Sequence, residues 1–171
     1  MGFINVLLKM GAKIKILNNK KHFGENVADI NIKYSDNLSG IDIDSKTVVS
    51  MIDEIPIFCI VASLANSNSN IHGINELRLK ESDRVKSILL NLNKMGGSIT
   101  EENDTLHVKG NRCLHNTTIK SFNDHRIAMS FFCLGQLLKG EIKIHNFETV
   151  NTSFPKFLTL MRKKIGAQFE I

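Results

Sequence analysis

Hydrophobic and polar residues follow the same order in three separate segments of the chain. Each segment carries apolar side chains at helical spacing, then a glycine, then a stretch in which apolar and polar residues alternate: residues 3–16, 85–99 and 154–169. A glycine after a helical pattern is typical of the left-handed residue that ends a helix. Alternation over a few residues is typical of a strand. The pattern therefore predicts three helices that end at glycines and lead into strands: Gly11, Gly96 and Gly166.

A second pattern repeats over a longer stretch. Asp53 and Asp124 each come just before a helix-like run of apolar and small residues, which a polar or glycine turn and an Ile-His pair follow. Both Asp residues stand where an N-cap side chain would accept a backbone N–H. The two Asp residues lie 71 positions apart and the two Ile-His pairs 73 positions apart. We therefore expect both Asp residues to cap helices, and both Ile-His pairs to end strands.

The predicted repeat unit is a helix, a strand, a helix and a strand, with an extra strand in the link. Two units fit after about residue 50, and residues 1–50 have the pattern of the tail of a third. Residues 3–8 have helical spacing but no preceding strand and no clear cap. We therefore expect the chain to be a fragment that lacks the start of its first unit.

Composition narrows the class of protein. Hydrophobic residues make up 42% and charged residues 23% of the 171 residues, as in globular domains of one core. The longest apolar runs are too short to cross a bilayer, and no signal-peptide pattern opens the chain. The three cysteines lie far apart, so we expect free thiols and no metal site. Free thiols are typical of a reducing compartment, so we expect a cytoplasmic protein. Because the apolar runs are short, we also expect no membrane partner.

The net charge of +5 is compatible with nucleic acid, with small anionic ligands or with a solvated basic surface. Lysines and arginines are scattered, and the chain has one Tyr and no Trp, so little surface is offered for stacking on bases. We therefore expect no nucleic-acid partner and favour small anions or a solvated face.

Residues 76–84, ELRLKESDR, combine charge with a predicted helix start. Residues 76–79 have an extended character, and Ser82 or Asp83 is placed to cap a helix that begins near residue 84. Free N–H groups at a helix N-terminus favour an anion. Together with Lys80 and Arg84, this helix start predicts a binding site for a phosphate or a carboxylate ligand. The side chain of Glu81, placed among these cations, is suited to move a proton during a reaction. The alternative is an ordinary capped helix with a salt-bridged first turn.

Residues 123–129, NDHRIAM, place His125 and Arg126 in the first turn of a helix that Asp124 would cap. The helix dipole disfavours cations there, which favours a functional reason for them. Arg126 is suited to hold a carboxylate or phosphate through two hydrogen bonds, and His125 to donate a hydrogen bond or move a proton. The alternative is a pair of solvent-facing side chains. For Asp53 the two interpretations are a helix cap and a general base that accepts a proton from a substrate hydroxyl.

Four motifs together resemble the EPSP synthase family, the 3-phosphoshikimate 1-carboxyvinyltransferases: MIDEIP, ELRLKESDR, NDHRIAM and TSFPKF. They occur in the family's order and rough spacing. The resemblance implies an α+β fold of βαβαββ repeat units, the enolpyruvyl transferase or inside-out α/β barrel fold. Here it would comprise about two complete units and the tail of a third. Residues 1–171 would then be the C-terminal substrate-binding domain, truncated at its N-terminal side, with the N-terminal domain absent.

The resemblance also implies a reaction. The family transfers the enolpyruvyl group of phosphoenolpyruvate to the 5-hydroxyl of shikimate 3-phosphate and releases phosphate, on the route to chorismate and the aromatic amino acids. No metal and no organic cofactor are needed. The site lies in a cleft between two domains, so this chain would supply one half of it.

Matching each motif to the family implies a role for each residue. Asp53 would accept the proton of the 5-hydroxyl and contact shikimate 3-phosphate, Lys80 would bind the same substrate, and Glu81 would move protons to and from the phosphoenolpyruvate methylene. Three side chains would bind phosphoenolpyruvate: Arg84, Arg126 and His125.

Some features depart from the family. Thr152 stands where some members have a lysine that contacts phosphoenolpyruvate, and Glu76 where some have Asn. The glycine- and serine-rich substrate loop and the cations of the N-terminal domain are absent, so a separate N-terminal half is a candidate partner. The alternatives are an inactive truncated or orphaned fragment, and the UDP-N-acetylglucosamine enolpyruvyl transferase of the same fold.

Overall fold

The computed structural model describes residues 2–111 and 113–170. The α-helices of this part are α1 (Gly2–Lys9), α2 (Ser45–Ser50), α3 (Ile55–Leu64), α4 (Arg84–Lys94), α5 (His125–Gly135) and α6 (Phe157–Ile165). The strands are β1 (Lys13–His22), β2 (Glu25–Lys33), β3 (Asp42–Ile43), β4 (Ser69–His72), β5 (Ile99–Glu102), β6 (Thr105–Val108), β7 (Thr118–Lys120) and β8 (Lys143–His145). Three short 3-10 helices complete them: η1 (Ile52–Glu54), η2 (Asn75–Leu79) and η3 (Phe147–Thr152).

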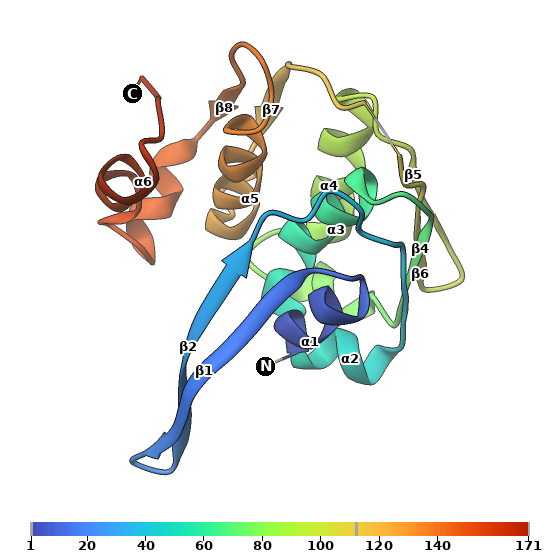
Figure 1. Cartoon of the computed structure of the whole chain (residues 1–171). Helices are drawn as coiled ribbons and strands as arrows, with labels where there is room; N and C mark the ends of the chain where they lie inside the picture. Colours follow the sequence, from blue (N-terminus) through green and yellow to red (C-terminus); the bar gives the residue numbers. More distant parts are fainter. Residues whose placement is uncertain (1, 112, 171) are drawn as a thin grey trace.

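Helices α3, α4 and α5 pack against one another in the middle of the molecule, and the strands lie outside them (Figure 1). Helix α3 is apolar on all sides, as expected of a helix surrounded by protein. Its Phe58 and Cys59 are fully buried, together with Ile88 of α4 and Phe131 of α5. The burial of Cys59 raises the pKa of its thiol, so this cysteine is an inert core residue.

The strands form a repeated arrangement. In the four-stranded sheet, whose order is β3-β4-β6-β5, β3 runs parallel to β4 while β6 runs antiparallel to both β4 and β5. The elements β3, α3, β4, α4, β5 and β6 therefore make one βαβαββ unit. The elements β7, α5, β8 and α6 repeat the first part of that unit, with β7 and β8 again parallel. The α+β class and the repetition predicted from the sequence are confirmed, but the described residues hold one complete unit and the first four elements of a second, where about two complete units were predicted.

The predicted helix ends are confirmed at all three glycines. Gly11, Gly96 and Gly166 have φ angles of 95°, 87° and 67°, in the left-handed region that a glycine adopts without strain. Strands follow the first two of them. The strand predicted after Gly166 is wrong, because residues 167–170 adopt no strand. An extended segment without a neighbouring strand forms no ladder of hydrogen bonds, and no described strand pairs with this one.

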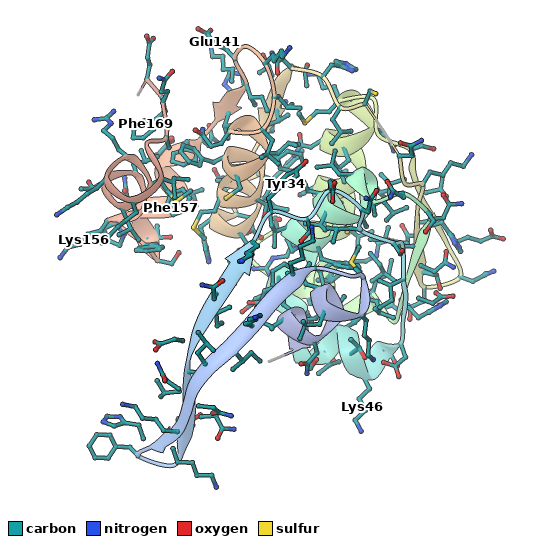
Figure 2. All side chains as sticks on the ribbon, in the orientation of Figure 1. Tyr34, Lys46, Glu141, Lys156, Phe157 and Phe169 are labelled. Atoms are coloured by element: carbon teal, nitrogen blue, oxygen red, sulfur yellow. The ribbon has the colours of Figure 1, made fainter. Side chains whose placement is uncertain are left out.

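The strands β1 and β2 form a long hairpin that projects away from the helices (Figure 2). It is a two-stranded sheet of its own, and most of its residues are exposed. No helix among the described residues has the length and apolar character needed to span a membrane.

Candidate functional site

The start of helix α4 forms one edge of the candidate site. Asp83 caps this helix through a 2.9 Å hydrogen bond that its carboxylate accepts from the backbone N–H of Lys86, which confirms the predicted cap. The extended character predicted for residues 76–79 is wrong, because they form the 3-10 helix η2. In this helix Leu77 is fully buried while Leu79 is exposed, whereas a strand would place these two side chains on the same face.

The start of helix α5 forms a second edge, and its predicted cap is also confirmed. One oxygen of Asp124 accepts hydrogen bonds of 2.8 and 3.3 Å from the backbone N–H groups of Arg126 and Ile127. The two residues before it, Phe122 and Asn123, have φ angles of 55° and 59°. Two successive left-handed residues that are not glycine are unfavourable, and such strain gathers at functional sites.

The segment that follows β8, namely Asn146 and the 3-10 helix η3, holds this left-handed turn in place. Thr149 donates a 2.9 Å hydrogen bond from its hydroxyl to the carbonyl of Asn123, and the Asn146 side chain donates one of 2.9 Å to the Asn123 side chain. The Ser121 hydroxyl donates in turn to the carbonyl of Asn146. The position of helix α5 is therefore set by a segment that follows it in the sequence.

Asp53 does not cap a helix, so that prediction is wrong. It lies in the 3-10 helix η1, and helix α3 begins after Glu54, whose side chain makes no capping hydrogen bond. The carboxylate of Asp53 instead contacts Arg84 and Arg126, which are 31 and 73 residues away. Two guanidinium groups are stronger partners for a carboxylate than a backbone N–H.

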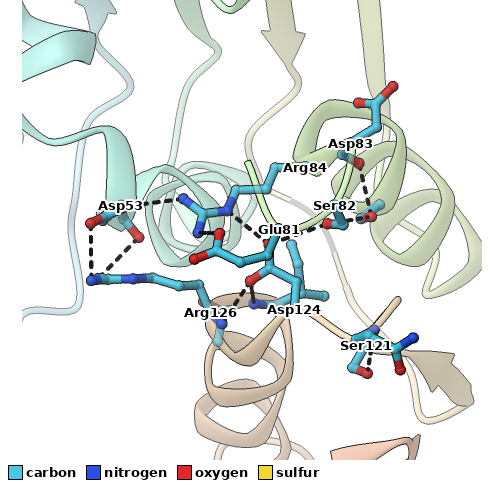
Figure 3. Close-up of polar contacts among 12 residues, drawn as sticks. Asp53, Glu81, Ser82, Asp83, Arg84, Ser121, Asp124 and Arg126 are labelled. Carbon is cyan, nitrogen blue, oxygen red and sulfur yellow. Dashed lines mark hydrogen bonds and ion pairs between the residues drawn. The ribbon is translucent and has the colours of Figure 1, made fainter. Parts of the chain in front are cut away.

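Arg84 is the centre of the site, and its side chain is only 1% exposed (Figure 3). Its Nε donates to Asp124 over 2.9 Å, Nη1 donates to Asp53 over 2.9 Å, and Nη2 donates to Glu81 over 2.5 Å. A buried guanidinium is stable only when its charge is paired and its N–H groups are bonded, and these three carboxylates meet that need. Arg84 thereby joins the starts of α4 and α5 to η1.

Arg126 lies beside this group and is 33% exposed. Its Nη2 is 3.0 Å from the second oxygen of Asp53, and its Nη1 is 3.5 Å from Glu54. Asp53 thus lies between the two guanidinium groups (Figure 3). We call the set of paired side chains the Arg84 network: Asp53, Glu54, Glu81, Arg84, Asp124 and Arg126.

The structure brings four of the six predicted site residues into this network. Of the other two, Lys80 is exposed at the same turn, and its charge acts on Asp53. His125 is half-buried in the first turn of α5, and its ring makes no hydrogen bond to another described residue. Both therefore lie at the border of the network and have side chains available to a ligand.

Electrostatics reinforces the pairing. Burial acts to raise the pKa of Asp53, but the hydrogen bond from Arg84 and the charges of Arg126 and Arg84 outweigh it, so the pKa lies below its usual value. Burial acts to lower the pKa of Arg84, and its hydrogen bonds to Asp124 and Asp53 reverse this, so the pKa is raised. Both groups are therefore charged at neutral pH.

Sequence reasoning missed two contributions to the site, those of Asp124 and Glu54. Asp124 was assigned only a cap, yet its second oxygen also accepts hydrogen bonds from Arg84 and from the Ser82 hydroxyl. Glu54 contacts Arg126. A signal existed for Asp124, since it precedes two cationic residues and opens a repeated landmark. Among the described residues, no group of three or more His, Cys, Asp or Glu side chains is arranged to hold a metal ion.

Comparison with known proteins gives a consistent result. A family model described as EPSP synthase (3-phosphoshikimate 1-carboxyvinyltransferase) matches residues 1–161. Two curated relatives named 3-phosphoshikimate 1-carboxyvinyltransferase, from Geotalea uraniireducens and Petrotoga mobilis, are 39% and 42% identical to the chain over 164 and 163 residues. These matches cover 96% and 95% of the chain but only 38% of each relative. The chain thus spans well under half the length of the relatives that it matches, and corresponds to their C-terminal portion.

Solved structures show the same likeness. An EPSP synthase from Acinetobacter baumannii superposes with a TM-score of 0.89 at 38% identity, over 95% of this chain and 38% of that one. The enolpyruvyl transferase NikO from Streptomyces tendae has a TM-score of 0.75 at 14% identity, over 98% of this chain and 35% of that one. At this identity the second likeness shows the fold alone, which this chain shares with another enolpyruvyl transferase.

Proposed function

The chain belongs to the EPSP synthase family, and on that premise we propose that it supplies one side of an active-site cleft for enolpyruvyl transfer. The reaction moves the enolpyruvyl group of phosphoenolpyruvate to the 5-hydroxyl of shikimate 3-phosphate and releases phosphate. The observation that carries the proposal is the Arg84 network, in which residues of three distant segments meet around two guanidinium groups.

The physical argument concerns charge. Both substrates are multiply anionic, and a transition state that develops negative charge is stabilised by fixed cations that need no reorganisation. Arg84 is fixed by three carboxylates and cannot swing away. Arg126 is held by Asp53 but keeps a third of its side chain exposed. We therefore propose that Arg126 makes the first contact with phosphoenolpyruvate, with Arg84 behind it and His125 at its side.

The carboxylates have separate proposed roles. We propose that the carboxylate of Asp53, which is 44% exposed, accepts the proton of the attacking 5-hydroxyl while it contacts shikimate 3-phosphate. Lys80, exposed at the neighbouring turn, would bind the same substrate. Glu81 is 48% exposed and bonded to Arg84 on one side only, so it is suited to carry a proton to and from the phosphoenolpyruvate methylene.

We further propose that residues 1–171 act as a C-terminal substrate-binding domain in the cytoplasm, together with an N-terminal half that supplies the remaining cations. No metal or organic cofactor takes part in the proposed reaction. The support for this division is the length of the relatives, since the chain matches 38% of them. Alone, the chain is expected to show negligible turnover, because half of the cleft is missing.

The test is reconstitution. The chain is mixed with the unmatched N-terminal part of the Petrotoga mobilis relative, and phosphate release from phosphoenolpyruvate and shikimate 3-phosphate is measured. We expect turnover in the mixture, and a loss of about a hundredfold or more on Arg126→Ala, since removal of a charged donor at a developing charge costs about that much. Asp53→Ala should have a similar effect.

The matched control is Arg162→Ala, which removes an exposed guanidinium from helix α6, far along the chain from the network. It should leave turnover unchanged. Turnover that survives both Arg126→Ala and Asp53→Ala would refute the residue assignments. Turnover by the chain alone would refute the need for a second half.

A further inference from the structure

The turn between the 3-10 helix η2 and helix α4 carries two of the proposed site residues, Lys80 and Glu81. It comprises residues 80–83. The side chain of Glu81 bonds Arg84, whereas Lys80 is exposed and forms no ion pair with another described residue. The place of the Lys80 ammonium group is therefore set by the backbone of the turn. Any contact that fixes this backbone also fixes where the cation can reach.

Arg78, the last residue but one of η2, provides such a contact. Its Nη1 donates to Oδ2 of Asp83 over 2.9 Å, and its Nη2 donates to Oε1 of Glu101 in strand β5. The pair of Arg78 and Asp83 spans five positions and encloses Lys80 and Glu81. We call the contacts of Arg78 with Asp83 and Glu101 the Arg78 clasp. It ties both ends of the turn to the four-stranded sheet.

The clasp is built for rigidity. Asp83 uses both oxygens, since Oδ1 caps α4 through the N–H of Lys86 while Oδ2 accepts from Arg78. The side chains of Asp83 and Glu101 are 36% and 29% exposed, so both pairs are partly shielded from water. A planar guanidinium that is bonded at both ends cannot rotate freely, which distinguishes the clasp from a loose pair of surface charges.

The second unit of the repeat makes the same connection without a clasp. Four residues, 153–156, separate η3 from α6, and the end of η3 and the start of α6 each lie 73 positions after those of η2 and α4. The counterparts of Arg78 and Asp83 are therefore Asn151 and Lys156. Lys156 makes no side-chain capping hydrogen bond, and in the part of the chain that the structure describes neither counterpart forms an ion pair.

Aromatic packing holds the turn of the second unit instead. The rings of Phe154 and Phe157 meet edge to face with their centroids 5.7 Å apart, and the N–H of Phe157 donates to the carbonyl of Phe154. The repeat therefore does not require a clasp at this connection. The clasp occurs at the turn whose charged side chains have proposed ligands, which points to a role beyond folding.

We propose that Arg78 is a positioning residue of the candidate site, which joins Asp83 to Glu101 and thereby fixes the turn that presents Lys80 and Glu81. The inference rests on the proposed function, which gives those two side chains their ligands. Arg78 itself is assigned no contact with a substrate, because carboxylates occupy both ends of its guanidinium. Precision matters here, since a shift of about 1 Å in a catalytic or binding group can cost about a hundredfold in rate.

The first measurement requires no reaction. NMR order parameters of the backbone amides of residues 80–82 are compared in the chain and in Arg78→Ala. We expect about 0.85 in the chain, as in rigid backbone, and less than about 0.6 in the variant. The amides of helix α4 should keep their values, because Asp83 still caps this helix. The matched control, Arg162→Ala, removes a guanidinium from α6 and should change neither region.

The second measurement uses the mixture with the N-terminal part of the Petrotoga mobilis relative. In Arg78→Ala the KM for shikimate 3-phosphate should rise about tenfold or more, because a mobile turn must be ordered on binding. The KM for phosphoenolpyruvate should change by no more than about twofold, because the contacts of Asp53 and Asp124 with Arg84 remain. Arg78→Lys, which reaches one carboxylate at a time, should recover part of the loss.

The anchor in β5 is tested against its neighbour. Glu101→Ala should loosen the turn and raise the same KM, but by less than Arg78→Ala does, because Asp83 stays bonded. The matched control is Glu102→Ala, which removes the same charge one position along the strand. It should leave the order parameters and both KM values unchanged.

Several outcomes would overturn the positioning role. They are unchanged order parameters in Arg78→Ala, a mobile turn with both KM values unchanged, and a fall in kcat alone, which is what a smaller amount of folded protein would produce. Equal effects of Glu101→Ala and Glu102→Ala would overturn the part assigned to β5. Absence of turnover with the unaltered chain would refute the proposed function instead, and the order parameters would then decide whether Arg78 fixes the turn.

Discussion

The starts of helices α3 and α5 occupy matching places in the repeat, yet their Asp residues, Asp53 and Asp124, make different contacts. Asp124 is fully buried, caps α5 with one oxygen and bonds Arg84 with the other. Asp53 is 44% exposed, caps nothing and bonds Arg84 and Arg126. Both face the same guanidinium, from the interior in one case and from the surface in the other.

The comparison shows how a repeated fold divides two tasks between equivalent positions. The buried carboxylate holds Arg84 in a fixed place and fixes the helix start as well. The exposed carboxylate remains accessible, at the side of the network where a ligand would arrive. An active site needs both, since a charged group must be oriented by groups that do not themselves react.

The largest effect is expected at the buried position. Asp124→Ala should lower the free energy of unfolding by about 3 to 5 kcal/mol, because Arg84 would stay buried without its most enclosed partner. Urea denaturation measures this. Asp124→Asn, which still offers a side-chain cap to α5, separates the two roles and should lose nearly as much. A loss of less than about 1 kcal/mol in Asp124→Ala would contradict the anchoring role.

The matching change at the exposed position should be much smaller. Asp53→Asn should lower the free energy of unfolding by about 1 kcal/mol or less, because ion pairs open to water contribute little. The same urea titration compares it with Asp124→Asn, so the two substitutions differ only in position. Equal losses of unfolding free energy in the two variants would contradict the proposal that Asp124 anchors Arg84 while Asp53 remains accessible to a ligand.

The smallest effect is the pH dependence of the Asp53 contribution. The pKa of Asp53 in the folded chain lies below its usual value, so the folded state favours the ionised form. The resulting stability is fully present above the unfolded pKa of about 3.9 and is lost as the pH falls through the lower folded pKa. The stability difference between the chain and Asp53→Asn should hold from pH 7 to about 5 and shrink below about 4. A difference that grows on acidification would contradict the ion pairs.

Much of the fold follows from local rules that the sequence displays. The glycines at 11, 96 and 166 end helices because no other residue adopts a left-handed conformation without strain. Asp83 and Asp124 cap helices because the free N–H groups are one turn away. The two Ile-His pairs end strands β4 and β8 as predicted.

The errors arise where distant residues decide. Asp53 was predicted to cap a helix, but two arginines that are remote in sequence draw its carboxylate away. The strand expected after Gly166 depended on a neighbour that no described residue supplies. The burial of Arg84 was not predicted, because the carboxylates around it come from three separate segments. Patterns along the sequence do not show which distant residues will contact one another.

The charge balance of the Arg84 network has a consequence for the order of events in time. Two guanidinium groups face four carboxylates, so the ionised network carries an excess of negative charge. The two guanidinium groups are already paired with these carboxylates, so they attract an anion less strongly than free cations would. The cations that reverse the sign would have to arrive with the other half. Assembly of the halves would then come first and substrate capture second, and raised ionic strength would slow the two steps to different extents.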